Sequence, residues 1–319
     1  MIDICVHKNT AYLYLENPDN YIRYFKVTIN GKLRDILTYQ NNESGEALRK
    51  LHNAFAGYIS FKYRTAASSF AYKKGKGIVD CVKCHLDGEF FLKTDIHAYF
   101  DSITYDNMLE CLKKLRIEED IREDVEFIAR ACFYCGRLPL GFTSSPVLSD
   151  LFLSFLDFKY QEIPDITYTR YADDFIISTN GQDAIKRLDS FKTLMSGDLE
   201  KLGLTLNSKK TYTRHLKSSG DALHVLGINI VRTDSGRNRI TVSDSYVRET
   251  SKLLCDWLSG NQHKEVVFFF QVLFGRISFI KQCSNESFEK LKKMVRVKCG
   301  YDGPFTRKVL KGNKASIVL

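Results

Sequence analysis

The amino-acid sequence predicts an α+β fold, and three observations support this prediction. Segments with the apolar, β-branched or aromatic character of strands, such as 33–39 and 90–96, are mixed along the chain with segments of helical periodicity. Residues beyond 242 are mostly helical in pattern. The 319 residues contain no internal repeat and no linker rich in Pro, Gly or Ser. We therefore expect two or three subdomains around a sizeable core, not separable domains.

The first third of the chain carries one clear turn signal. Asn30-Gly31 lies between apolar flanks, a pattern typical of a tight β-hairpin. Around this turn we expect, in chain order, a mixed or strand-like segment over 11–27, a strand over 33–39, a helix over 45–60, a polar glycine-bearing turn over 72–77 and a helix reaching about residue 85.

The rest of the chain is read in the same way. Pro146 stands near the start of a helical pattern, where proline is tolerated, and Gly203 follows one as a C-cap. We expect, in chain order, a strand over 90–96, two helices within 107–135, a helix over 144–158, a tight hairpin over 167–179, a helix over 182–202, short strands over 223–231 and 239–242, and a mostly helical remainder.

The net charge of +9 is unevenly distributed. Residues 241–319 hold 14 Lys and Arg against 7 Asp and Glu, which gives this last quarter a charge of +7. A basic region of this kind suits a surface that meets phosphates, although solvated helix faces would explain the charge equally well.

The N-terminus shows no leader pattern, and the longest apolar stretch, 266–274, is too short to span a bilayer. We therefore expect a cytoplasmic protein without membrane contact. Nine cysteines in such a chain indicate reduced, mostly buried thiols. Cys81 and Cys84 together with Cys132 and Cys135 leave open a four-thiolate zinc site, but their apolar, helix-like surroundings disfavour it.

Three carboxylates stand within or beside apolar strands. Asp173 and Asp174 lie at the bend of the 167–179 hairpin, and Asp95 ends the 90–96 strand. Adjacent residues of a regular strand point to opposite faces, so only a bend lets both carboxylates face one ion. Buried carboxylates repel each other unless a cation neutralises them, and Mg²⁺ prefers such oxygen ligands. Taken alone, Asp173-Asp174 is better explained as an exposed acidic turn.

Five blocks in order resemble the reverse transcriptase family. They are Lys93-Thr-Asp-Ile-His-Ala-Tyr-Phe-Asp101, Leu138-Pro-Leu-Gly-Phe-Thr-Ser-Ser-Pro146, Tyr168-Thr-Arg-Tyr-Ala-Asp-Asp174, Gly203-Leu-Thr-Leu-Asn-Ser-Lys-Lys-Thr211 and Val225-Leu-Gly-Ile228. The resemblance implies a right-hand polymerase fold with fingers, a palm containing an antiparallel sheet, and a helical thumb. It assigns 1–90 and 105–143 to the fingers, 91–104 and 144–240 to the palm, and 241–319 to the thumb.

The resemblance also implies roles for individual residues. Asp95, Ile96, Asp173 and Asp174 would hold two Mg²⁺ ions, for which Mn²⁺ may substitute, and Lys210 would neutralise or protonate the leaving pyrophosphate. Phe100 would clash with a 2′-hydroxyl and so favour deoxynucleotides. The remaining candidates for binding the nucleoside triphosphate are Lys32, Arg34, Lys74, Lys76, Ile96, Leu140 and Gly141.

The pattern departs from that of the retron polymerases, which are nearest in size and block order. Leu140 stands where these enzymes carry glutamine, Cys81-Val82 replaces Asn-Ala, and Val225-Leu226-Gly227 replaces Val-Thr-Gly. The sequence therefore favours a defence-associated bacterial reverse transcriptase outside the retrons, with a retron enzyme as the near alternative.

The chain leaves no room after the thumb for a ribonuclease H, an endonuclease or a maturase segment. We therefore expect a structured non-coding RNA to supply the template and possibly the primer, deoxynucleoside triphosphates as substrates and DNA as the product. An accessory protein or a homo-oligomer is also possible.

Two other functions and one other priming mode remain open. An RNA-dependent RNA polymerase would share the palm chemistry, but Phe100 argues against it. A non-catalytic RNA-binding protein would have no need to bury three carboxylates. Priming from a tyrosine or serine hydroxyl is compatible with the 17 tyrosines, none of which is singled out.

Overall fold

The computed structural model describes residues 7–29, 31–114, 122–260, 266–306 and 310. The chain divides into two compact units, the first formed by Met1–Cys81 with Phe90–Thr213 and the second by Val82–Glu89 with Arg214–Leu319. Residues 214–240, which the sequence assigns to the palm, thus cluster with the C-terminal helices. The boundaries of fingers, palm and thumb stay predictions.

The first unit begins with a helix where the sequence predicts a mixed or strand-like segment. Over its first half that prediction is wrong: α1 (Lys8–Glu16) is followed by the 3₁₀ turn η2 (Pro18–Asn20), and the strand β1 starts only at Ile22. The physical reason is the spacing of Ala11 and Tyr14, which are both fully buried one helical turn apart.

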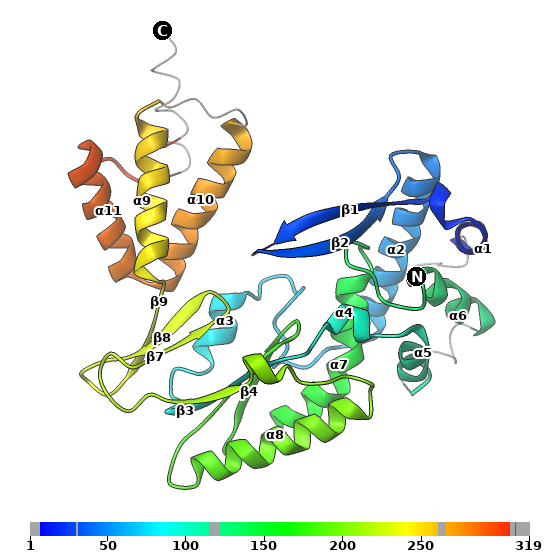
Figure 1. The fold of residues 1–319 in the computed structure, drawn as a ribbon, viewed down its shortest axis with the longest axis horizontal. Helices are drawn as coiled ribbons and strands as arrows, with labels where there is room; N and C mark the ends of the chain where they lie inside the picture. Colours follow the sequence, from blue (N-terminus) through cyan, green and yellow to red (C-terminus); the bar gives the residue numbers. More distant parts are fainter. Residues whose placement is uncertain (1–6, 30, 115–121, 261–265, 307–309, 311–319) are drawn as a thin grey trace. The chain divides into compact units, whose positions relative to one another are not determined.

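The predicted hairpin is confirmed. β1 (Ile22–Ile29) and β2 (Lys32–Tyr39) pair antiparallel with Ile29 opposite Lys32, so the turn has two residues. Gly31 has φ +74°, a conformation that glycine adopts without steric cost, while Asn30 lies outside the described residues. This hairpin is drawn in blue in Figure 1.

Five helices follow within the described residues up to 131, and the predicted positions are largely confirmed. Asn42 caps the longest of them by accepting a hydrogen bond from the Gly45 amide at 2.8 Å. The helices are α2 (Glu43–Lys62), α3 (Ile78–Lys83), α4 (Tyr99–Ser102), α5 (Tyr105–Lys114) and α6 (Arg122–Ala131).

A four-stranded sheet with the order β4-β5-β3-β6 forms the centre of the first unit. Its strands are β3 (Phe90–Asp95), β4 (Thr167–Tyr171), β5 (Asp174–Thr179) and β6 (Tyr212–His215), the last of which crosses into the second unit. The helices α7 (Ser145–Gln161) and α8 (Ala184–Glu200) contact its strands (Figure 1), and the 3₁₀ turn η4 (Ser208–Lys210) precedes β6. Buried Phe152, Phe175 and Phe191 belong to the core between them.

The described residues of the second unit form a small sheet followed by the helices α9 to α11. The predicted single strand over 223–231 is wrong: β7 (Ala222–Val225) and β8 (Ile228–Arg232) form a hairpin, beside which lies β9 (Asn238–Thr241). Leu226 and Gly227, at φ +53° and +80°, make the turn that divides the apolar run. The helices α9 (Asp244–Leu258), α10 (Val266–Cys283) and α11 (Asn285–Cys299) pack side by side (Figure 1).

Across the part of the chain that the structure describes, every helix is too short or too polar to cross a membrane.

Candidate active site

The three predicted catalytic carboxylates lie at one end of the central sheet. In the β4–β5 hairpin Tyr171 pairs with Asp174, so Ala172 and Asp173 form a two-residue turn. Ala172 adopts φ +56°, which is uncommon for a residue with a Cβ. On the other side of β5, Asp95 pairs directly with Asp174. The bend predicted from the sequence therefore exists, and it brings all three carboxylates together.

Burial and mutual repulsion raise the pKa of the two carboxylates in the hairpin, Asp173 and Asp174. The side chain of Asp95 is 3% exposed. Burial raises the pKa of Asp173, and the neighbouring charge of Asp95 raises it further. Burial likewise raises the pKa of Asp174, with smaller increases from Asp173 and Asp95. A carboxylate cluster of this kind requires positive charge close by in order to stay ionised.

Two lysines supply part of that charge. The ammonium group of Lys210 donates a hydrogen bond to Asp95 Oδ2, and this bond raises the pKa of Lys210. Lys93 Nζ lies 3.7 Å from Asp174 Oδ1. Lys210 was predicted from the sequence, whereas Lys93 was not. The sequence feature that could have indicated Lys93 is its position, because it interrupts an otherwise apolar strand two residues before Asp95.

The carboxylates fit a divalent cation, but not as a closed protein cage. Among the residues that the structure describes, no three His, Cys, Asp or Glu side chains form a ready-made metal cluster. However, Asp95 Oδ1 is buried and has no hydrogen-bond partner, so it is an open acceptor. Ile96 has an aliphatic side chain, and only its carbonyl oxygen could bind an ion. This donor set suits a divalent cation that keeps water and substrate oxygens among its ligands.

The predicted triphosphate-binding cations divide into two groups. Arg34 is exposed on β2, and its charge offsets a small part of the rise in the pKa of Asp173. Lys74 is exposed in the loop before α3. Lys76 instead turns back on its own loop, donating to the Ala67 carbonyl at 2.7 Å. The side chain of Lys32 lies outside the described residues.

The predicted pocket residues are tied to the β1–β2 hairpin. The Leu37 amide donates a hydrogen bond to the Leu140 carbonyl at 2.9 Å. Gly141 has φ +110°, and a Cβ there would lie 2.0 Å from the Leu37 carbonyl oxygen. Phe100, in α4, is partly buried with its ring 5.6 Å from that of Tyr99. Leu140 and Gly141 therefore sit beside the strand that carries Arg34.

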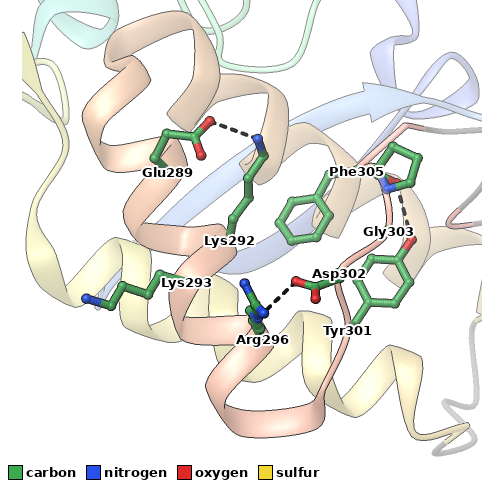
Figure 2. A pocket seen from close by; sticks show the side chains of 9 residues that line it. Glu289, Lys292, Lys293, Arg296, Tyr301, Asp302, Gly303 and Phe305 are labelled. Carbon is green, nitrogen blue, oxygen red and sulfur yellow. Dashed lines mark hydrogen bonds and ion pairs between the residues drawn. The ribbon is translucent and has the colours of Figure 1, made fainter.

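A pocket of the second unit contains none of the predicted site residues. Figure 2 shows this pocket of about 510 Å³ at the end of α11. Two of its three cations are paired with acids, since Lys292 binds Glu289 at 2.8 Å and Arg296 binds Asp302 at 3.2 Å. Its remaining side chains include the stacked rings of Tyr301 and Phe305.

The cysteine pairs give no support to a zinc site. Cys81 and Cys132 are buried, whereas Cys84 and Cys135 are exposed. Cys81 Sγ contacts the Thr169 hydroxyl at 3.2 Å. Over the described ranges of the chain, no cysteine cluster could hold a metal ion.

Comparison with known proteins was made once this geometry was established. The model of the family described as reverse transcriptase (RNA-dependent DNA polymerase) matches residues 46–230. The chain belongs to the reverse transcriptase family. The matched segment contains the three carboxylates and Lys210, and it confirms the family resemblance carried by the five sequence blocks.

Several retron reverse transcriptases of Escherichia coli are similar in sequence. The Ec86 enzyme is 28% identical over 206 residues, which cover 63% of this chain and 62% of that protein. The Ec73 enzyme is 27% identical over 243 residues, which cover 71% and 73%. The match thus spans less than two thirds of the Ec86 enzyme.

Solved telomerase structures share the fold. Telomerase from Candida albicans, solved with a fragment of telomeric RNA, superposes with a TM-score of 0.54 at 12% identity, covering 93% of this chain and 63% of that one. The truncated apo telomerase from Candida tropicalis gives a TM-score of 0.51 at 14% identity, covering 74% and 59%. Together with the family match, this confirms the right-hand polymerase fold class. At this level of identity the likeness to telomerase shows the fold alone.

Proposed function

We propose that this chain is an RNA-directed DNA polymerase that transfers deoxynucleotides to a nucleic-acid 3′ end at Asp95, Asp173 and Asp174. The observation that carries the proposal is the pairing of Asp95 with Asp174 across β3 and β5, beside the turn that holds Asp173. Membership of the reverse transcriptase family and the buried, unpartnered Oδ1 of Asp95 support it.

We assign the chain's own residues as follows. The three carboxylates would hold two Mg²⁺ ions, with Mn²⁺ as a substitute, and the ions would activate the 3′-hydroxyl and neutralise the leaving pyrophosphate. Arg34 would hold the triphosphate with its planar fork. Lys210 Nζ would give a proton to the pyrophosphate oxygen as the bond to the α-phosphorus breaks. Phe100 would exclude ribonucleotides by contact with the 2′-hydroxyl.

We propose that the template, and possibly the primer, is a dedicated structured non-coding RNA in a bacterial antiviral defence system. An accessory protein or a second copy of the chain could take part, and the cytoplasm is the expected location. The basic C-terminal quarter of the chain, with a charge of +7, supports an RNA partner of this kind.

A second candidate is favoured by the sequence matches to the Ec86 and Ec73 enzymes, which are named retron reverse transcriptases. In that case the product would be single-stranded DNA linked covalently to RNA. Ribonuclease treatment of the labelled product tests for this linkage, because a linked product becomes smaller; a product that keeps its size excludes the retron type.

The test is DNA synthesis by protein purified with its accompanying nucleic acid, given Mg²⁺ and labelled nucleotides, followed by sequencing of the product. We expect Asp173→Ala/Asp174→Ala to reduce synthesis at least about a thousandfold, because the charge that holds the metal is lost. Asp183→Ala/Asp189→Ala, which removes two exposed carboxylates of the α8 region, is the matched control and should retain activity.

Three results would contradict the proposal. Synthesis that survives loss of both carboxylates would place the chemistry elsewhere. Efficient use of ribonucleotides would indicate an RNA polymerase. Absence of synthesis, both on the accompanying nucleic acid and on an added RNA template with a DNA primer, would favour a non-catalytic RNA-binding protein.

A further inference from the structure

Arg170 is a cation buried inside the catalytic sheet. It lies in β4, two residues before Ala172 of the catalytic turn, and its side chain is 0% exposed. Removal of a guanidinium from water is strongly unfavourable unless ion pairs and hydrogen bonds compensate. The hydrogen-bond and ion-pair partners of Arg170 therefore indicate its role.

Two carboxylates of α7 provide the compensation. Arg170 Nε donates to Asp157 Oδ1 at 2.9 Å, and Nη2 donates to Asp150 Oδ1 at 2.8 Å. Asp150 and Asp157 are seven residues apart, or about two helical turns, so they share one face of α7. Lys73 Nζ lies 3.7 Å from Asp150 Oδ2. Two cations thus balance two anions in this cluster.

The third arm of the guanidinium reaches the catalytic turn. Arg170 Nη1 donates to the Ala172 carbonyl at 3.1 Å. Because Nε and Nη2 are fixed on the carboxylates, the planar fork sets the direction of Nη1. Ala172 is the residue with φ +56°, so the bond stabilises a strained conformation immediately before Asp173. A lysine has a single nitrogen and could not bind both the carboxylates of α7 and the Ala172 carbonyl.

The same residue also holds the loop over 66–76. The Arg170 amide donates to the Ser68 carbonyl, and the Phe70 amide donates to the Arg170 carbonyl, both at 2.9 Å. Ser69 Oγ donates to Asp150 Oδ1 at 2.6 Å. The loop is therefore attached to Arg170 through its main chain and through the shared carboxylate of Asp150.

The same loop carries Tyr72 and the predicted triphosphate-binding cation Lys74. Tyr72 has φ +62°. Arg170 thus joins the loop that carries Lys74 to the turn that carries Asp173.

We propose that Arg170 is a positioning residue: its guanidinium fixes the catalytic turn through the Ala172 carbonyl and couples this turn to the loop over 66–76. It is fully buried and acts through Ala172. The inference deepens the proposed function and rests on it for the activity readout.

The test compares Arg170→Lys with Arg187→Lys in the full chain. Arg187 is the matched control because it serves the far end of the same hairpin, donating to the Thr179 hydroxyl at 2.8 Å. Each variant is checked for folding by circular dichroism. The measurements are kcat, the KM for template–primer, and the affinity for Mn²⁺, the last by electron paramagnetic resonance without substrate. Asp150→Asn provides a second variant should Arg170→Lys fail to fold.

We expect Arg170→Lys to lower kcat on the order of 10- to 100-fold and to weaken Mn²⁺ binding about tenfold, with little change in the KM for template–primer. Arg187→Lys should stay close to wild type. A folded Arg170→Lys protein with wild-type kcat and Mn²⁺ affinity would overturn the proposal, as would equal losses in both variants.

The Mn²⁺ measurement separates this inference from the proposed function. A wild-type protein that binds Mn²⁺ but makes no DNA would overturn the proposed function. Even then, weaker Mn²⁺ binding by Arg170→Lys alone would support the positioning role, and equal binding by all proteins would refute it.

Discussion

Gly141 illustrates how a single missing side chain positions a site. Its φ of +110° and the 2.0 Å gap between a Cβ and the Leu37 carbonyl oxygen leave no room for any other residue. We expect Gly141→Ala to lower the free energy of unfolding by about 2–5 kcal/mol, through backbone strain and overpacking. Urea unfolding followed by circular dichroism measures the change.

Gly197 in α8 offers the matched control, because no atom lies within 4 Å of a Cβ built there. Gly197→Ala should stabilise the protein by about 0.5–1 kcal/mol, as expected for alanine in a helix. If both alanine variants behaved alike, the packing of Gly141 against Leu37 would not be the cause.

At this scale the sequence predicted the acidic half of the site better than the basic half. Asp95, Asp173 and Asp174 stand in recognisable blocks, and the register of β3, β4 and β5 brings them together. Lys93 and Arg170 were missed because a cation in an apolar strand gives no sign of which carboxylate it will meet. That information lies in the pairing of distant elements, here β4 with α7.

Among the elements, the β7–β8 hairpin carries a turn of unusual composition. Leu226 and Gly227 both have positive φ, the combination of a type I′ turn, for which Asn-Gly is the favoured sequence. We expect Leu226→Asn to stabilise the second unit by about 0.5–1 kcal/mol, because asparagine tolerates the left-handed conformation.

The single tryptophan, Trp257, belongs to the second unit and reports its unfolding by fluorescence. Leu226→Ala is the control, since it removes the same apolar atoms without easing the strain. A gain in stability with alanine, or none with asparagine, would show that Leu226 is held by packing and not strained by its backbone.

The same hairpin shows why element boundaries were the weakest predictions. A continuous apolar run over 223–231 reads as one strand, because the positive φ of a leucine leaves no trace in the sequence. In the same way α1 was missed, since its two buried residues become meaningful only against α2 and α6. Longer periodic segments, such as α2 and α8, were predicted within a few residues.

Across the whole molecule, each unit buries a neutral histidine. His52, in the first unit, lies between the Tyr39 hydroxyl at 2.8 Å and the Ala131 carbonyl at 2.9 Å. Burial lowers the pKa of His52 to about 4 and that of His85, in the second unit, to about 3. Both values lie below the ordinary histidine pKa of about 6.5.

These shifts predict acid sensitivity. Because the unfolded chain binds protons at about pH 6.5 and the folded chain does not, stability is complete above pH 6.5 and falls as the pH drops toward 4. Between pH 7 and pH 5, each histidine should lower the free energy of unfolding by about 2 kcal/mol. Urea unfolding at both pH values measures the loss, and His52→Gln should reduce it. An unchanged pH dependence in that variant would exclude His52 as the cause.

The hydrogen bond from the Leu37 amide to the Leu140 carbonyl has a consequence for how such an enzyme can diversify. Residue 140 contributes its main-chain carbonyl to this hydrogen bond, and that group does not depend on the side chain. The side chain of Leu140 takes no part in the bond and is only partly buried. Selection can therefore exchange leucine for glutamine at this position without rebuilding the scaffold, whereas the glycine beside it is fixed.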